Sequence, residues 1–216
     1  ELDLFAMPWY ILLIGFIVVV GVINAYNFMD GINGITASYS LAVGGLLMLA
    51  NRELAFIDPD LLAYSMLALL VFAFFNFRTR AKCFAGDVGS VSIAFILLFA
   101  LGMLILHTGN LIYFLFLTVY GIDAVWTIVR RLYLRENIFE AHRSHLYQFL
   151  GNEAGVNKLL VSFLYGVIQL LIGLAVIYVA TLSLTVQITF AVVLLFVLSA
   201  AYLIGKTYVI RKFVKA

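Results

Sequence analysis

Four polar side chains recur every three residues in the segment 24–33 of a chain that is otherwise rich in apolar residues. They are Asn24, Asn27, Asp30 and Asn33, with Gly31 and Gly34 beside them. The spacing places the amides and the carboxylate in one sector at the end of a helix, and the glycines permit a turn and close backbone approach to a ligand. Capping a helix end would need only one or two such residues. Polar groups near a bilayer are costly and usually functional, so the pattern favours a binding site.

A second polar cluster, in the sequence KCFAGDVGSVS, centres on Asp87, which lies between Gly86 and Gly89 directly before an apolar segment. One interpretation is that Asp87 or Ser90 caps the helix that begins there. A carboxylate at a helix N-terminus flanked by glycines can also hold Mg²⁺ while backbone N–H groups face phosphate oxygens. Together with the first cluster and the Lys and Arg residues of the loops 76–89 and 130–158, this segment predicts a site for phosphate and magnesium.

A third cluster, HRSH at residues 142–145, places two histidines three residues apart with an arginine between them. Two histidines at this spacing could form half of a zinc site. The chain has no HExxH sequence, and no further His or Cys is expected on that face. Arg143 can donate two parallel hydrogen bonds to a phosphate. We therefore expect His142, Arg143 and His145 to contact phosphate or sugar and not zinc.

Asp123 is an acid inside an apolar segment, in the sequence GIDAVWTIVRR. A charged residue within a membrane span is a candidate for function. Arg130 and Arg131 follow one to two helical turns later, so a structural ion pair with them is an equally weighted alternative.

The composition is that of an integral membrane protein. The 216 residues are 65% hydrophobic and 11% charged, and the mean hydropathy is +1.14. Soluble domains are about 45–50% apolar and about 25% charged. Cys83 is the single cysteine, which excludes an internal disulfide.

Seven apolar segments are candidates to cross a bilayer, which takes about 20 residues in a helix. They are 8–26, 35–50, 61–77, 90–107, 111–129, 158–180 and 187–206. Helices satisfy their own backbone hydrogen bonds in lipid. The sequence therefore predicts an all-α polytopic bundle of about seven spans, in one domain over 1–216, with a cytoplasmic loop at about 130–157.

The basic residues predict the orientation. The segments 76–89, 130–158 and 206–215 hold three, five and four Lys or Arg, which is twelve of the thirteen, and only Arg52 falls elsewhere. Cytoplasmic loops carry the excess of Lys and Arg. We therefore expect the N-terminus outside, the C-terminus in the cytoplasm, and the three polar clusters together at the cytoplasmic face.

In this order, the clusters resemble the motifs of the polyprenyl-phosphate N-acetylhexosamine-1-phosphate transferases, a family that includes phospho-N-acetylmuramoyl-pentapeptide transferase. The NxxNxxDGxDG-type motif of that family is matched by Asn24, Asn27, Asp30, Gly31 and Gly34. Its F-[ML]-G-D-x-G-S motif is matched by Phe84, Gly86, Asp87, Gly89 and Ser90. The sequence HRSHLYQ looks like the form in the branch that starts bacterial O-antigen and related surface glycans.

Two departures from the family pattern stand out. Asn33 occupies the position of the second acid in DGxDG. The aspartate-rich DDxxD motif of the family has no counterpart, because the chain contains no adjacent pair of acids. Since family members also have further spans, we expect this chain to be the C-terminal portion of a longer transferase.

The resemblance implies transfer of an N-acetylhexosamine 1-phosphate from a UDP-sugar to undecaprenyl phosphate, with release of UMP. The expected place is the inner membrane of a bacterium, in cell wall biogenesis such as the initiation of lipopolysaccharide O-antigen. The expected cofactor is Mg²⁺, with Mn²⁺ as an alternative, bound by Asp87. The partners would be UDP-N-acetylhexosamine, undecaprenyl phosphate and the bilayer, without nucleic acid, and a homodimer stays open. The implied catalytic residues are Asp87 and Asp30, and the implied substrate-binding residues are Asn24, Asn27, Asn33, Asn76, His142, Arg143 and His145.

Two other functions stay open at this point. A transporter or channel would use Asp123 and Asp30 as coupling or pathway groups. That function predicts polar residues near span centres or paired broken helices, whereas the acids other than Asp123 lie at span ends. A non-catalytic fragment or scaffold of such a transferase is the second alternative, because the DDxxD motif is absent.

Overall fold

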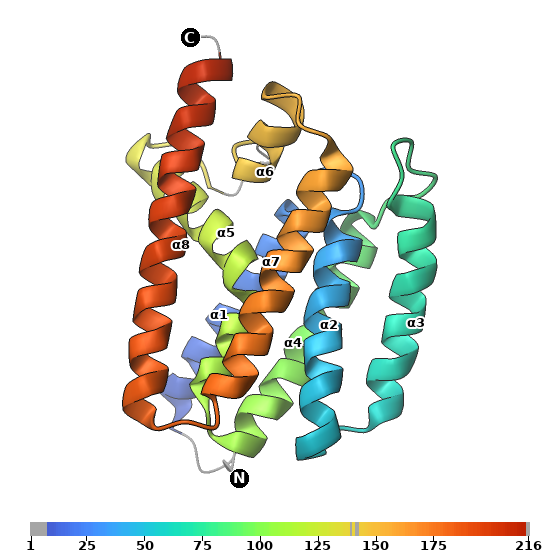
Figure 1. Cartoon of the computed structure of the whole chain (residues 1–216), viewed down its shortest axis with the longest axis vertical. Coiled ribbons are helices and arrows are strands. Elements are labelled where there is room, and N and C mark those ends of the chain that lie inside the picture. Colours follow the sequence, from blue (N-terminus) through green and yellow to red (C-terminus); the bar gives the residue numbers. More distant parts are fainter. Residues whose placement is uncertain (1–7, 139, 141–142, 215–216) are drawn as a thin grey trace.

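The computed structural model describes residues 8–138, 140 and 143–214, and every regular element in this part is helical. Seven long helices lie side by side in one bundle (Figure 1). The all-α architecture predicted from the sequence is confirmed. The long helices are α1 (Trp9–Phe28), α2 (Ile35–Leu54), α3 (Pro59–Asn76), α4 (Gly86–Thr108), α5 (Thr118–Tyr133), α7 (Lys158–Val179) and α8 (Leu184–Phe213). The short ones are η2 (Leu111–Leu117), α6 (Leu146–Gln148) and η3 (Phe149–Glu153).

Six helices in the described part are long and apolar enough to cross a membrane. They are α1, α3, α4, the continuous segment Leu111–Tyr133, α7 and α8. The expected seventh span is α2, which has 20 residues but does not meet the same criterion of length and composition. Its lower hydropathy has a physical reason: 12 of its 20 residues are buried inside the bundle, where polar side chains such as Thr36 and Ser40 find protein partners.

The outer helices α1 and α8 expose long apolar surfaces. In each of them only 6% of the apolar window is buried within the described structure. An exposed apolar surface of this extent is not stable in water. Since six helices of the described part are long and apolar enough to cross a bilayer, the chain is a multi-pass membrane protein.

The loops divide between two ends of the bundle. The loop 77–85, the described segments 134–138 and 143–157 and the C-terminal end of α8 lie at one end, which we call the basic end (Figure 1). The turns that join α2 to α3, α4 to η2 and α7 to α8 lie at the other end. The basic loops thus gather at one end as the sequence predicts, while the side of the membrane that this end faces stays a prediction.

One crossing segment is irregular, and this irregularity sets the course of α5. The 3₁₀-helix η2 changes into the α-helix α5 at Thr118, and such a change leaves backbone groups without their usual partners. Gln169 of α7 binds two of them: its Oε1 accepts from the N–H of Val119 (3.0 Å), and its Nε2 donates to the carbonyl of Leu115 (3.0 Å). The irregular backbone is therefore satisfied inside the protein, as membrane burial requires.

Candidate active site

The first two polar clusters meet at the basic end of the bundle. Nδ2 of Asn27, in the last turn of α1, donates to Oδ1 of Asp87, in the first turn of α4, over 3.2 Å. Oγ of Ser90 donates to Oδ1 of Asn27 over 2.6 Å. Asn27 therefore uses both ends of its amide to join motifs that are 60 residues apart in the sequence.

Asp87 is exposed and does not cap its helix. The residue that precedes α4 is Ala85, and no side chain makes the capping hydrogen bond there. The capping interpretation of Asp87 and Ser90 is therefore wrong, because the helix begins at Gly86 and both side chains already lie within it. Within the described part, the carboxylate of Asp87 accepts one side-chain hydrogen bond, on Oδ1, and the residue is exposed.

Asp30 is a half-buried carboxylate beside the same turn. Oγ1 of Thr36 donates to its Oδ1 over 2.6 Å. Burial raises the pKa of Asp30, and the hydrogen bonds from Thr36 and from the backbone of Gly86 oppose that rise. The contact with Gly86 places Asp30 next to the N-terminus of α4, and hence near Asp87.

Two of the amides expected to bind substrate hold the surrounding loops together. Oδ1 of Asn76 accepts from the N–H of Gly34 (2.7 Å), and its Nδ2 donates to the carbonyl of Cys83 (2.9 Å). Nδ2 of Asn33 donates to the carbonyls of Arg78 (2.9 Å) and Thr79 (3.2 Å). These side chains clamp the loop 30–34 to the loop 77–85, and direct contact with substrate stays a prediction for both. Asn24 is exposed on α1, one turn before Asn27.

The two glycines of the first motif are required by close contacts. Gly34 has a φ of +85°, and a Cβ there would lie 2.4 Å from Cδ2 of Phe77. A Cβ on Gly31 would lie 2.3 Å from Oη of Tyr147 and 2.6 Å from Nε2 of Gln148. The segment that follows the third cluster therefore packs directly against the Asp30–Gly31 loop.

The third cluster reaches the site through its neighbours. His142 lies outside the described residues, and Arg143 is exposed at the basic end. His145 is only 2% exposed, and its Nδ1 lies 3.2 Å from Oδ1 of Asp123. Oη of Tyr147 donates to the carbonyl of Phe28 over 3.0 Å. The first two clusters therefore lie together, and the segment directly after the third cluster packs on the first, while contact of His142, Arg143 and His145 with substrate stays a prediction.

Asp123 does not form the ion pair with Arg130 or Arg131 that was one of the two interpretations. Arg131 instead pairs with Glu136 over 3.2 Å. The two arginines lie seven and eight residues further along α5, about 10–12 Å along a helix axis, and neither is within ion-pair distance of Asp123 in the described structure. The carboxylate of Asp123 is buried and binds side chains from other helices.

Residues 2–122, more than half of the chain, match a family model described as Glycosyl transferase family 4. The chain belongs to this family. It is 30% identical over 153 residues to the probable undecaprenyl-phosphate N-acetylglucosaminyl 1-phosphate transferase of Bacillus subtilis (strain 168), which covers 68% of this chain and 42% of the relative. It is 30% identical over 155 residues to the undecaprenyl-phosphate alpha-N-acetylglucosaminyl 1-phosphate transferase of Thermotoga maritima, covering 67% and 45%. The chain thus spans less than half the length of these curated relatives, and the family resemblance of its motifs is confirmed.

In this family 4 chain, sequence reasoning missed several residues that shape the site. Thr36 holds Asp30, and Tyr147 reaches the end of α1. Lys206, expected in the basic tail, lies inside α8 and is only 4% exposed. Thr36 is one hydroxyl residue within an apolar segment, so no spacing pattern indicates its role. The position of Lys206 directly after an apolar segment is equally typical of a basic tail and of a helix that continues.

The site has few candidate metal ligands. Among the described residues, no group of three or more His, Cys, Asp and Glu could hold a metal ion. Mg²⁺ does not require such a group, because it commonly binds through one or two carboxylates together with substrate phosphates and water. The exposed carboxylate of Asp87, held on one oxygen by Asn27, fits this mode of binding.

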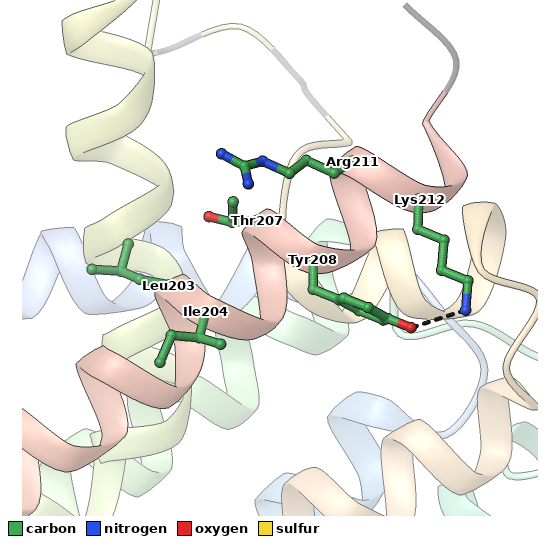
Figure 2. A pocket seen from close by; sticks show the side chains of 6 residues that line it. All are labelled: Leu203, Ile204, Thr207, Tyr208, Arg211 and Lys212. Atoms are coloured by element: carbon green, nitrogen blue, oxygen red, sulfur yellow. Dashed lines mark hydrogen bonds between the residues drawn. The ribbon is translucent and has the colours of Figure 1, made fainter.

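Two hollows differ in their relation to the site. A groove of about 310 Å³ lies between α2, α3 and α4, and its lining includes Thr36, Ala68, Phe72, Gly89, Ile93 and Ile96. It begins beside Asp30, because Thr36 belongs to both. Figure 2 shows a hollow on α8 that contains none of the expected site residues; its lining is Leu203, Ile204, Thr207, Tyr208, Arg211 and Lys212.

Proposed function

We propose that this chain forms the phosphate-binding part of an enzyme that transfers an N-acetylhexosamine 1-phosphate from a UDP-sugar to undecaprenyl phosphate. UMP leaves, and the product carries the first sugar of a surface glycan such as lipopolysaccharide O-antigen. The observation that carries this proposal is the Asn27–Asp87 contact, which joins the two acidic motifs at the basic end of an apolar bundle. Family membership and the names of the two relatives support the same reaction.

The position of the site suits two substrates that live in different phases. A polyisoprenyl phosphate is dissolved in the bilayer, and a nucleotide sugar is confined to water. Their phosphates can meet only at the membrane surface, where the ends of the apolar helices α1 and α4 would lie. We place this surface on the cytoplasmic side of the inner membrane, because the basic loops gather there.

Asp87 would hold Mg²⁺, or Mn²⁺ in its place, through its exposed carboxylate. The ion would offset the charge of two phosphate groups that otherwise repel each other. The hydrogen bond from Asn27 fixes Oδ1 and so orients the carboxylate. Arg143, exposed at the same end, would donate hydrogen bonds to phosphate.

Asp30 would accept a proton from the phosphate of the lipid. Burial raises the pKa of Asp30, and a general base is most efficient when its pKa lies close to the working pH. Thr36 holds one of its oxygens and also lines the apolar groove between α2, α3 and α4. The first isoprene units of the lipid would occupy that groove, which places the lipid phosphate beside Asp30.

The test is UMP release by the full-length protein in nanodiscs, with undecaprenyl phosphate, UDP-N-acetylhexosamines and a magnesium titration. Asp87→Asn keeps the size of the side chain but removes the charge that binds a hard cation. We expect a loss on the order of 10²–10³ in rate, or about 3–4 kcal/mol. Asp60→Asn is the matched control, because Asp60 is an exposed acid in the first turn of α3 at the opposite end. Wild-type turnover by Asp87→Asn at limiting magnesium would remove Asp87 from the metal site.

A further inference from the structure

Asp123 lies at the centre of a buried hydrogen-bond cluster that the reaction chemistry does not explain. Its side chain is about 1% exposed. It accepts from Oη of Tyr165 in α7 (2.8 Å) and from Oη of Tyr202 in α8 (3.1 Å). A carboxylate inside a bundle costs free energy unless it is paired and hydrogen-bonded. We therefore ask which positive charge stabilises this carboxylate and which part of the structure the carboxylate holds in place.

The cluster holds the beginning of α6. Oδ1 of Asp123 accepts from the N–H of Leu146 (3.0 Å) and lies 3.2 Å from Nδ1 of His145. The N–H of Tyr147 lies 3.5 Å from Oδ2. Helix α6 has only three residues and continues into a π-helical turn, so its own hydrogen bonds cannot fix its place. Asp123 supplies the anchor.

The anchored segment is the one that packs on the active-site loop. Oη of Tyr147 binds the carbonyl of Phe28 at the end of α1, and it leaves no room for a Cβ on Gly31. Arg143 precedes His145 by two residues, so the same anchor limits where its guanidinium can reach. A shift of α6 would therefore displace both the contact of Tyr147 with the Gly31 loop and Arg143, which we expect to bind phosphate.

Besides His145, whose Nδ1 lies 3.2 Å from Oδ1 of Asp123, Lys206 of α8 brings a positive charge to the cluster. Its Nζ donates to Oγ1 of Thr127 (2.9 Å) and to Oη of Tyr202 (2.6 Å), and it is only 4% exposed. Both hydroxyls in turn donate to Oδ1 of Asp123, over 3.4 Å and 3.1 Å. Among the described residues Lys206 makes no direct salt bridge, so the two hydroxyls connect the opposite charges.

We propose that Asp123 and Lys206 are positioning residues that hold the His145–Gln148 segment against the Asp30–Gly31 loop. Through this unit, α8 sets the geometry of a site to which it contributes no side chain. The inference rests on the proposed function for its catalytic consequence. Its structural part, the anchoring of α6 by a charge on α8, can be measured without any substrate.

The test compares two Lys–Tyr pairs on the same helix. Lys206→Met and Tyr202→Phe disrupt the buried unit, and Tyr202→Phe removes a single oxygen, so the fold should survive. Lys212→Met and Tyr208→Phe are the matched controls, because Nζ of Lys212 donates to Oη of Tyr208 over 2.9 Å on the exposed face of α8 (Figure 2). All four variants are made in the full-length protein in nanodiscs.

The first readout is hydrogen–deuterium exchange of peptides that cover residues 144–153. We expect this exchange to be at least about tenfold faster in Lys206→Met and Tyr202→Phe than in wild type, because loss of its anchor lets this segment open without unfolding the rest of the protein. Exchange in α7 should not change, and both control variants should behave like wild type. The second readout is UMP release. A displacement of about 1 Å can cost about 10²-fold in rate, so kcat should fall by about 10–100-fold with a smaller change in KM for the nucleotide sugar.

The double variant Tyr202→Phe/Lys206→Met should lose no more rate than the worse single variant, because both changes interrupt one connection. Unchanged exchange at 144–153 in Lys206→Met would overturn the proposal, as would faster exchange spread evenly over α7. If the wild-type protein releases no UMP, the proposed function fails, and the exchange data still decide whether Lys206 anchors α6.

Discussion

Gly31 lies directly against the side chains of Tyr147 and Gln148, so Gly31→Ala is a sharp perturbation of the contact between the active-site loop and the α6 segment. The backbone of Gly31 lies outside the left-handed region, and alanine can adopt its conformation. All of the effect should therefore come from the added methyl group. That group would lie 2.3 Å from Oη of Tyr147 and 2.6 Å from Nε2 of Gln148.

The size of the effect follows from these distances. Ordinary contact begins at 3.4 Å, so Oη of Tyr147 must retreat by about 1.1 Å, the difference between 2.3 and 3.4 Å. Its hydrogen bond to the carbonyl of Phe28 then breaks, at a net cost of about 1 kcal/mol. Overpacking typically costs about 1–3 kcal/mol in total. A misplacement of this size should also lower the rate of transfer by about 10²-fold.

Thermal unfolding in nanodiscs and UMP release measure the two effects. Tyr147→Phe removes the clashing oxygen and leaves Cζ at 3.1 Å, so Gly31→Ala/Tyr147→Phe should be more stable than the sum of the single losses predicts, by about 0.5–3 kcal/mol. Gly45→Ala is the control with the opposite sign. Nothing lies within 4 Å of a Cβ there, and alanine in a helix interior is about 0.5–1 kcal/mol better than glycine. Wild-type stability and activity of Gly31→Ala would refute the packing of α6 on this loop.

Three further predictions concern charge, lipid and topology. Asp30→Asn should lower the rate by about 10²-fold or more without lowering the unfolding temperature, since burial raises the pKa of Asp30 and disfavours the charge that the amide removes. As the pH falls through that raised pKa, the folded state binds the proton before the unfolded state does, so the stability of wild type relative to Asp30→Asn should increase. A decrease in this relative stability would contradict the buried environment of Asp30. Ala68→Trp should fill the groove between α2, α3 and α4 and raise KM for undecaprenyl phosphate but not for the UDP-sugar, and an equal rise in both would place the lipid elsewhere. In a Cys83→Ser background, impermeant thiol reagents added to intact cells should label cysteines at positions 55 and 183 but not at 80 and 144, and labelling at 144 would reverse the orientation.

The long helices could be predicted from the sequence because lipid imposes length and hydropathy on each of them separately. The expected segment 158–180 became α7, Lys158–Val179, and 111–129 became η2 with α5. The ends were less accurate. Helix α8 continues to Phe213, past the expected end at 206, because polar residues mark where lipid ends and not where backbone hydrogen bonds end.

The contacts of the site were predictable only in part. The number of spans between two motifs predicts whether both lie at the same end of the bundle, and Asn27 and Asp87 do contact each other there. The partners of Asp123 were not predictable, because they come from three other elements and depend on how η2 and Gln169 set the course of α5. Pairing of Asp123 with Arg130 or Arg131 was a local hypothesis, and local spacing along one helix cannot reveal a tyrosine on another.

Asn33 shows how a departure from the family pattern can have a structural cause. The related motif has an acid at this position, and a carboxylate there could only accept hydrogen bonds. In this chain the amide donates to two carbonyl oxygens, those of Arg78 and Thr79. A carboxylate in the same place would face both oxygens with no hydrogen to offer, and two acceptors cannot bind each other. The second negative charge of the motif is therefore replaced by a donor that clamps the loop 77–85, and that loop leads directly into Asp87. Asn33 supports the expected metal ligand through the backbone, while Asp30 keeps the charge of the motif.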